Sequence, residues 1–204
     1  MKKFRSLLLV TAAAAICVPA AMAQTATTTT TPKQTVNQRK DNQQDRIGEG
    51  VENGSLTAGE ATHLEKKESS LNKEEHHMRA EGNGKLTAAD RAKLNRQQNH
   101  LSNQIYKQKH DAQAQNVNPK SEVGQRQRNQ QQRIGEGIEN GSMTAGEAAR
   151  AERHEAGMNK EISGMRQANG GKLTNGEKSF VNHQQNRNSR GIYRQKHNPR
   201  HQRS

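Results

Sequence analysis

An internal duplication is the feature that most constrains how this chain folds. Residues 39–111 align with residues 126–198 at a constant offset of 87 without gaps, and more than half of the aligned positions are identical. The segment RIGEGVENGSLTAGEA at 46–61 returns as RIGEGIENGSMTAGEA at 133–148, and IYKQKH at 105–110 returns as IYRQKH at 192–197. A repeat of this length indicates that a whole structural unit was duplicated.

Each copy also contains two G-x-L-T-x-x-acid patterns (Met143 replaces Leu in one), and these predict helix starts. A Thr followed three residues later by an acid fits a capping box, in which each side chain accepts a backbone N–H of the first turn. The four pairs are Thr57–Glu60, Thr87–Asp90, Thr144–Glu147 and Thr174–Glu177. We therefore expect helices over about 39–53, 57–81 and 87–111, each with a narrow apolar stripe, and their equivalents in copy two.

The expected fold class is all-α, a tandem duplication of a three-helix, hairpin-like unit with one short and two long helices. The expected organisation is a signal peptide at 1–23, a disordered Thr-rich leader at 24–37, helical repeat 1 at 38–111, a linker at 112–124, helical repeat 2 at 125–198 and a basic tail at 199–204. Low hydrophobicity with high charge is also typical of disorder, so a wholly disordered mature chain is the alternative.

The first 23 residues have the pattern of a secretory signal. Lys2, Lys3 and Arg5 precede a largely apolar run, and Ala21-Met22-Ala23 fits a signal-peptidase site. The alternative, a membrane anchor, requires about 20 apolar residues, and this run is shorter. Cleavage before Gln24 would give a periplasmic or secreted bacterial protein without a thiol, because Cys17 is the only cysteine.

The composition argues against an enzyme. The chain has two Tyr, two Phe and no Trp, and it lacks the common nucleotide-binding, hydrolase and zinc motifs. The carboxylates are expected on helix surfaces among cations, because so few apolar residues leave little material for a low-dielectric pocket. Most of the nine His residues have no His at the equivalent position of the other copy. We therefore predict no catalytic residues, no metal ligands and no cofactor.

The G-x-L-T-x-x-acid pattern has a second interpretation, a calcium site. Its Gly, apolar residue and acid have the spacing of positions 6, 8 and 12 in an EF-hand loop. The first ligand position would then hold Arg79 or Arg166 in two of the four loops, and the third would hold Val51 or Ile138 in the others. A cation and an aliphatic side chain are poor calcium ligands. Helix capping explains the same residues without a metal.

Charge is distributed unevenly between the copies. Copy one, 38–112, has 13 basic and 12 acidic residues, whereas copy two, 125–204, has 15 basic and 7 acidic residues. No acid follows Glu177, and the basic residues beyond it are the candidate anion contacts: Lys178, Arg187, Arg190, Arg194, Lys196, Arg200 and Arg203. A basic segment attracts polyanions through Coulomb forces and counterion release. The alternative is a basic tail that only aids solubility.

The repeated G-x-L-T-x-x-E helix starts and the I-Y-x-Q-K-H ending resemble uncharacterised exported bacterial repeat proteins, a resemblance that implies no known activity. The L-T-x-x-acid starts are also similar to the L-T-x-x-Q motifs of small periplasmic stress chaperones, which implies an all-helical, enzyme-free fold that holds unfolded proteins. The third similarity is to degenerate EF-hand loops.

These observations predict a non-catalytic exported helical repeat protein that binds anionic envelope or extracellular polymers through its basic second repeat. The candidate partners are lipopolysaccharide, acidic lipid, acidic polysaccharide and extracellular DNA, with at most peripheral attachment to a membrane. One alternative is a periplasmic holdase for unfolded proteins, suggested by the Leu and Met stripes of the long helices. The other is a weak calcium- or metal-responsive EF-hand-like module.

Overall fold

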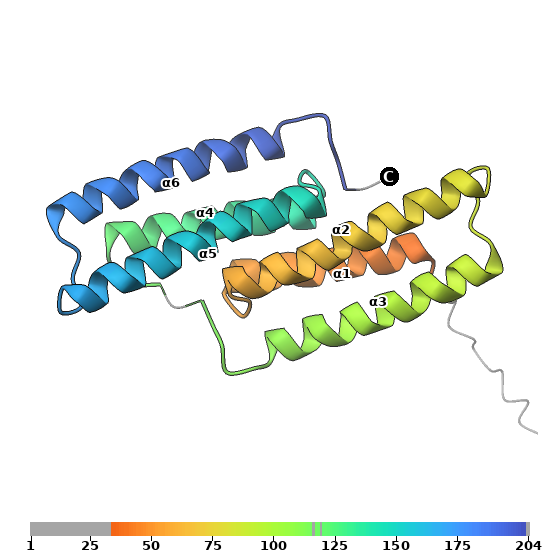
Figure 1. Cartoon of the computed structure of the whole chain (residues 1–204), viewed down its shortest axis with the longest axis horizontal. Coiled ribbons are helices and arrows are strands. Elements are labelled where there is room, and N and C mark those ends of the chain that lie inside the picture. Colours follow the sequence, from red (N-terminus) through yellow and green to blue (C-terminus); the bar gives the residue numbers. More distant parts are fainter. Residues whose placement is uncertain (1–33, 116, 119, 203–204) are drawn as a thin grey trace, which may run out of the picture. The chain divides into compact units, whose positions relative to one another are not determined.

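The computed structural model describes residues 34–115, 117–118 and 120–202, and every regular element in these ranges is an α-helix (Figure 1). Copy one comprises α1 (Val36–Asn53), α2 (Ala58–Glu81) and α3 (Ala88–Lys109). Copy two comprises α4 (Glu122–Glu139), α5 (Ala145–Ala168) and α6 (Asn175–Lys196). The expected all-α duplication of a unit with one shorter and two longer helices is confirmed. The expected signal peptide lies outside the described residues.

The four Thr-led capping boxes are confirmed. The hydroxyl of Thr57 accepts the N–H of Glu60, and the Glu60 carboxylate accepts the N–H of Thr57 at 2.8 Å. The boxes at Thr144 and Thr174 are closed in the same way by the Glu three residues later. The shorter Asp90 also closes its box, accepting the N–H of Thr87 at 2.9 Å. These local bonds satisfy N–H groups that a helix start otherwise leaves without an acceptor.

The first helix of each copy begins earlier than expected. Thr35 caps α1, accepting the N–H of Gln38 at 3.2 Å, while Gln38 accepts the N–H of Thr35 at 2.9 Å. This box has Gln in place of an acid, and it extends α1 into the segment predicted as leader. In copy two Ser121 caps α4, which places the start of that helix within the predicted linker.

The turn between the first two helices depends on glycine. Gly54 has φ 76° and Gly141 has φ 70°, a left-handed conformation that glycine adopts without strain. The carbonyl of Gly50 accepts the N–H of Leu56 at 2.9 Å, and a Cβ on Gly50 would lie 2.7 Å from the Leu56 side chain. Leu56 therefore folds back over α1 only because residue 50 has no side chain. Gly137 has the same relationship with Met143.

The two copies pack through equivalent helices. Helix α1 contacts α4 and α2 contacts α5, while α3 covers α1 and α2, and α6 covers α4 and α5 (Figure 1). The largest buried apolar cluster contains residues of both copies: Ile47, Val51, Leu56, Ala61, Leu64, Leu101 and Ile105 with Ile134, Ile138, Met143, Ala148, Ala151 and Ile192. Part of each narrow apolar stripe is therefore covered by the other copy, while two smaller clusters each lie within one copy.

Glutamine side chains join the outer helices to the first helices. Gln43 of α1 donates from Nε2 to the carbonyl of Gln98 at 2.7 Å and to Oγ of Ser102 at 2.8 Å. Gln98 of α3 donates to the carbonyl of Val36 at 2.9 Å. The equivalent bonds recur in copy two, from Gln130 and Gln185. Buried hydrogen bonds of this kind supply the packing contacts that a chain with few apolar residues lacks.

The I-Y-x-Q-K-H motif forms the end of α3 and of α6. In copy one Ile105 is buried in the core and the ring of Tyr106 stacks on His110 with centroids 4.2 Å apart. Lys109 forms an ion pair with Glu49 of α1 at 2.6 Å. Copy two repeats the stack between Tyr193 and His197 and the ion pair between Lys196 and Glu136. The motif thus anchors the end of the third helix.

Candidate functional site

Four buried glutamates lie where the two copies meet. Glu65 and Glu68 are on α2, Glu152 and Glu155 occupy the equivalent positions on α5, and each is at most 1 % exposed. The expectation that the carboxylates lie on helix surfaces is therefore wrong for these four residues. The spacing of glutamates along α2 resembles a solvated helix face, and the packing of α2 against α5 and against the helices of its own copy covers it.

These carboxyl groups receive fewer hydrogen bonds than their oxygens can accept. Gln131 Nε2 donates to Glu152 at 3.1 Å and Asn188 Nδ2 donates to Glu155 at 2.6 Å. Gln44 Nε2 lies 3.3 Å from both oxygens of Glu65. One oxygen each of Glu68, Glu152 and Glu155 has no partner. A buried carboxylate in this condition is costly, which favours the protonated form.

The pKa values follow from this burial. Desolvation raises the pKa of Glu152 and of Glu155 to about 8. Desolvation, together with the neighbouring charges of Glu68 and Glu152, raises the pKa of Glu65 well above its ordinary value. Desolvation raises the pKa of Glu68 to about 8, although Lys40 opposes the shift. The chain was expected to have little material for a low-dielectric pocket, yet the packing of the two copies removes these four carboxyl groups from water.

Comparing the copies shows only that the four glutamates occupy unchanged positions. Glu65 and Glu68 are identical at the equivalent positions 152 and 155, and Gln44 recurs as Gln131. The histidines, by contrast, mostly change between copies. Identity alone does not mark them as buried, because the exposed Glu49 and Glu136 are also identical and pair with equivalent lysines.

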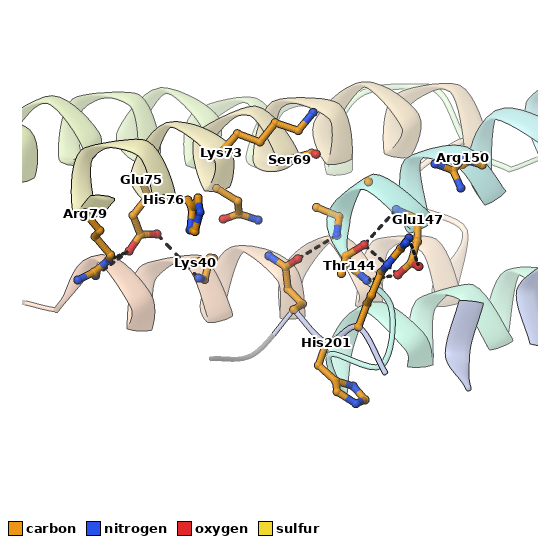
Figure 2. A pocket seen from close by; sticks show the side chains of 15 residues that line it. Lys40, Ser69, Lys73, Glu75, His76, Arg79, Thr144, Glu147, Arg150 and His201 are labelled. Carbon is orange, nitrogen blue, oxygen red and sulfur yellow. Dashed lines mark hydrogen bonds and ion pairs between the residues drawn. The ribbon is translucent and has the colours of Figure 1, made fainter. Parts of the chain in front are cut away.

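A cleft of about 660 Å³ lies between the copies, and the four buried glutamates are not among its lining residues (Figure 2). Helices α1 and α2 form one wall, and the first turn of α5 with residues 200–202 forms the other. We call this the inter-repeat cleft. Five Lys or Arg residues, two His and two Glu are among its lining residues: Lys40, Lys73, Arg79, Arg150, Arg200, His76, His201, Glu75 and Glu147.

Both glutamates of the inter-repeat cleft are engaged by nearby groups. Figure 2 shows Glu75 at one end, where Arg79 lies 2.7 Å and Lys40 lies 3.8 Å from its oxygens. At the other end Glu147 closes the capping box of α5 and lies 3.8 Å from Arg200. In the described part of the chain, no carboxylate forms an ion pair with Lys73 or Arg150. The cleft therefore has an excess of positive charge.

The predicted anion contacts are not gathered at one place. Lys178, Arg187, Arg190 and Arg194 are exposed on α6. The last three have the i, i+3, i+7 spacing of one helix face, which we call the α6 basic face. Lys196 is paired with Glu136, Arg200 lies at the inter-repeat cleft, and Arg203 lies outside the described residues. The sequence analysis did not single out Lys73 and Arg150, which line the inter-repeat cleft and belong to different copies.

Among residues 34–115, 117–118 and 120–202, no three His, Cys, Asp or Glu side chains are grouped so that they could hold a metal ion. Within the same ranges, no helix combines the length and the apolar character that crossing a membrane requires. The large apolar side chains exposed in the described part are Tyr106, Phe180 and Tyr193. Comparison with known proteins found no matching family model, curated protein or solved structure.

Proposed function

We propose that this protein is a non-catalytic, exported binding protein that attaches to anionic polymers through the α6 basic face. One observation carries the proposal: Arg187, Arg190 and Arg194 are exposed on one face of α6, and no described carboxylate forms an ion pair with them. The helix has a single acid, Glu177, in its first turn. Unpaired cations at this spacing attract phosphate, sulfate or carboxylate groups repeated along a polymer.

Lipopolysaccharide, acidic lipid, acidic polysaccharide and extracellular DNA share this chemistry, so the first experiment uses heparin as a general polyanion. The triple variant Arg187→Ala, Arg190→Ala and Arg194→Ala is expected to elute from heparin at clearly lower salt than the parent. Each lost polyanion contact should reduce the slope of log affinity against log salt by roughly one.

The matched control removes three exposed cations from copy one, through Lys66→Ala, Lys85→Ala and Lys107→Ala. Net charge falls equally in both variants, so only the position of the lost charges differs. Equal elution of the two triple variants would show that net charge alone causes retention, and the proposal would then be wrong. Vesicles with and without anionic lipid, and duplex DNA, then separate the candidate polymers.

The holdase hypothesis finds no specific support. Leu64 and Met158, which belong to the apolar stripes that suggested it, are buried, and Leu71 and Met78 pack against the core clusters. These side chains hold the copies and the hairpins together. An exposed apolar surface for clients would have to be sought elsewhere on the molecule.

A further inference from the structure

We propose that the inter-repeat cleft is a binding site for a single phosphate group, separate from the α6 basic face. The proposal goes beyond polymer attachment, because the ligand is one compact oxyanion held by groups of both copies. Three independent features meet in the cleft: the first turn of α5, a buried amide donor and cations without carboxylate partners.

The first turn of α5 lines the cleft with residues 144–147. Gln202 accepts the N–H of Ala145 at 2.9 Å, and Thr144 accepts that of Glu147. The next N–H, that of Gly146, has no acceptor among the described residues. A helix start also carries a partial positive charge, which favours an anion. Gly146 leaves this position open, since a Cβ there would lie 3.3 Å from the Ser69 hydroxyl oxygen.

Gln202 supplies the second feature. Its side chain lines the cleft and is buried, with 9 % exposed. Its Oε1 is bound to the N–H of Ala145, which fixes the orientation of the amide, and its Nε2 has no hydrogen-bond partner. A buried N–H₂ group without an acceptor is unfavourable, and an oxyanion in the cleft would satisfy it.

The third feature is charge from both copies. Lys73 of α2 and Arg150 of α5 line the cleft from opposite walls (Figure 2). Five Lys or Arg residues face two Glu, and those two are already engaged. A doubly charged phosphate matches this excess better than a single carboxylate, and its tetrahedral oxygens can accept hydrogen bonds from several directions.

Copy one contains the same backbone arrangement without the same charge. Gln115 accepts the N–H of Ala58 at 3.2 Å, as Gln202 does for Ala145. At the equivalent positions, however, His63 replaces Arg150, Gln113 replaces Arg200, Ala114 replaces His201 and Ala156 replaces Ser69. Gln127 likewise replaces Lys40. The helix start and its amide cap are thus shared, and Lys73 recurs as Lys160 and Arg79 as Arg166. The cations at positions 40, 150 and 200 are particular to the cleft at α5.

This difference gives matched variants for calorimetric titration of the full chain with inorganic phosphate. Arg150→Gln is expected to weaken phosphate binding about tenfold or more, because it removes a charged donor. The control His63→Gln, at the equivalent position of copy one, should leave the affinity unchanged. Both side chains are exposed, so neither change should affect folding, which circular dichroism verifies.

A second pair tests the helix start itself. Gly146→Val should abolish phosphate binding by filling the space beside Ser69, whereas Gly59→Val, at the equivalent start of α2, should not. Sulfate is expected to compete with phosphate, and acetate is not. The proposal is overturned if the parent chain gives no saturable binding of phosphate, or if the paired variants bind equally.

The outcome is separable from that of the proposed function. The triple variant of the α6 basic face should keep phosphate affinity while losing retention on heparin. Arg150→Gln should lose phosphate affinity and keep most of its retention. Loss of phosphate binding in the α6 variant would show that the cleft is not a separate site.

Discussion

Gly48 and Gly135 face each other where α1 crosses α4. A Cβ on Gly48 would lie 2.9 Å from the carbonyl oxygen of Gly135, and a Cβ on Gly135 would lie 2.8 Å from that of Gly48. Each would also meet the side chain of a glutamate on the other helix, Glu139 or Glu52. The two helices therefore approach more closely than residues with side chains allow, and the symmetry of the contact follows from the duplication.

Gly48→Ala should destabilise the protein by about 1–3 kcal/mol, the usual cost of forcing extra volume into a packed contact. The backbone carbonyl that it would meet cannot rotate away as a side chain can. Urea unfolding followed by circular dichroism measures the change. The control is Gly157→Ala in α5, where a Cβ meets nothing within 4 Å. It should stabilise the helix by up to about 1 kcal/mol, and a loss equal to that of Gly48→Ala would contradict the interpretation.

Stability should fall as pH rises from about 4.5 to about 8. In the unfolded chain the glutamates lose their protons near their ordinary pKa of 4.5, whereas Glu68, Glu152 and Glu155 keep theirs in the folded protein until about pH 8. Unfolding in this window releases protons, so raising the pH favours unfolding. Urea midpoints at intervals across this range measure the effect.

Glu152→Gln should flatten this pH dependence, because an amide occupies the same volume without a charge. The exposed Glu161→Gln is the control, and it should leave the slope unchanged. Glu74 beside Lys93 and Asp90 beside Thr87 have lowered pKa values. They therefore change the stability only at lower pH, below the range in which the buried glutamates act. Stability that rises between pH 5 and 8 would exclude protonated carboxyls in the core.

Thr144→Ala should cost about 1 kcal/mol of stability, the typical contribution of a helix cap. The variant loses the hydroxyl that accepts the N–H of Glu147 and that also donates to its carboxylate at 2.9 Å. Thr144→Ser keeps the hydroxyl and should stay within a few tenths of a kcal/mol of the parent. Thermal melting of the two variants side by side distinguishes loss of the cap from loss of the methyl group.

Lys40→Gln should destabilise the protein by about 1–3 kcal/mol, and more at pH 8 than at pH 5. Lys40 is buried, pairs with Glu75 and holds down the pKa of Glu68. Without it, ionising Glu68 is harder, and its deprotonation at high pH costs more. Lys73→Gln, an exposed change on the facing helix, is the control for loss of charge. Equal effects at both pH values would contradict the coupling between Lys40 and Glu68.

Local interactions made the secondary structure predictable. A capping box involves residues three positions apart, so Thr57 with Glu60 and Thr144 with Glu147 could be recognised without knowing the fold. The exact offset of 87 then required both copies to adopt the same three helices. The start of α1 at Val36 was not predicted, because the capping box of Thr35 has Gln38 in place of the acid of the four repeated patterns.

The candidate sites depend on contacts that no local pattern records. Glu65 and Glu152 are buried because α2 and α5 pack on each other and on α1 and α4, and in an isolated helix either would be solvated. Arg150 and Lys73 line one cleft although 77 positions separate them along the chain.

The helices and their duplication can be recognised in the amino-acid sequence, because hydrogen bonds within single turns define the helix starts. Which carboxyl groups leave water and which cations converge depends instead on how the helices pack. Burial and electrostatic potential depend on residues that are distant in the chain and are brought together by packing. Here the packed surfaces belong to different copies of the repeat.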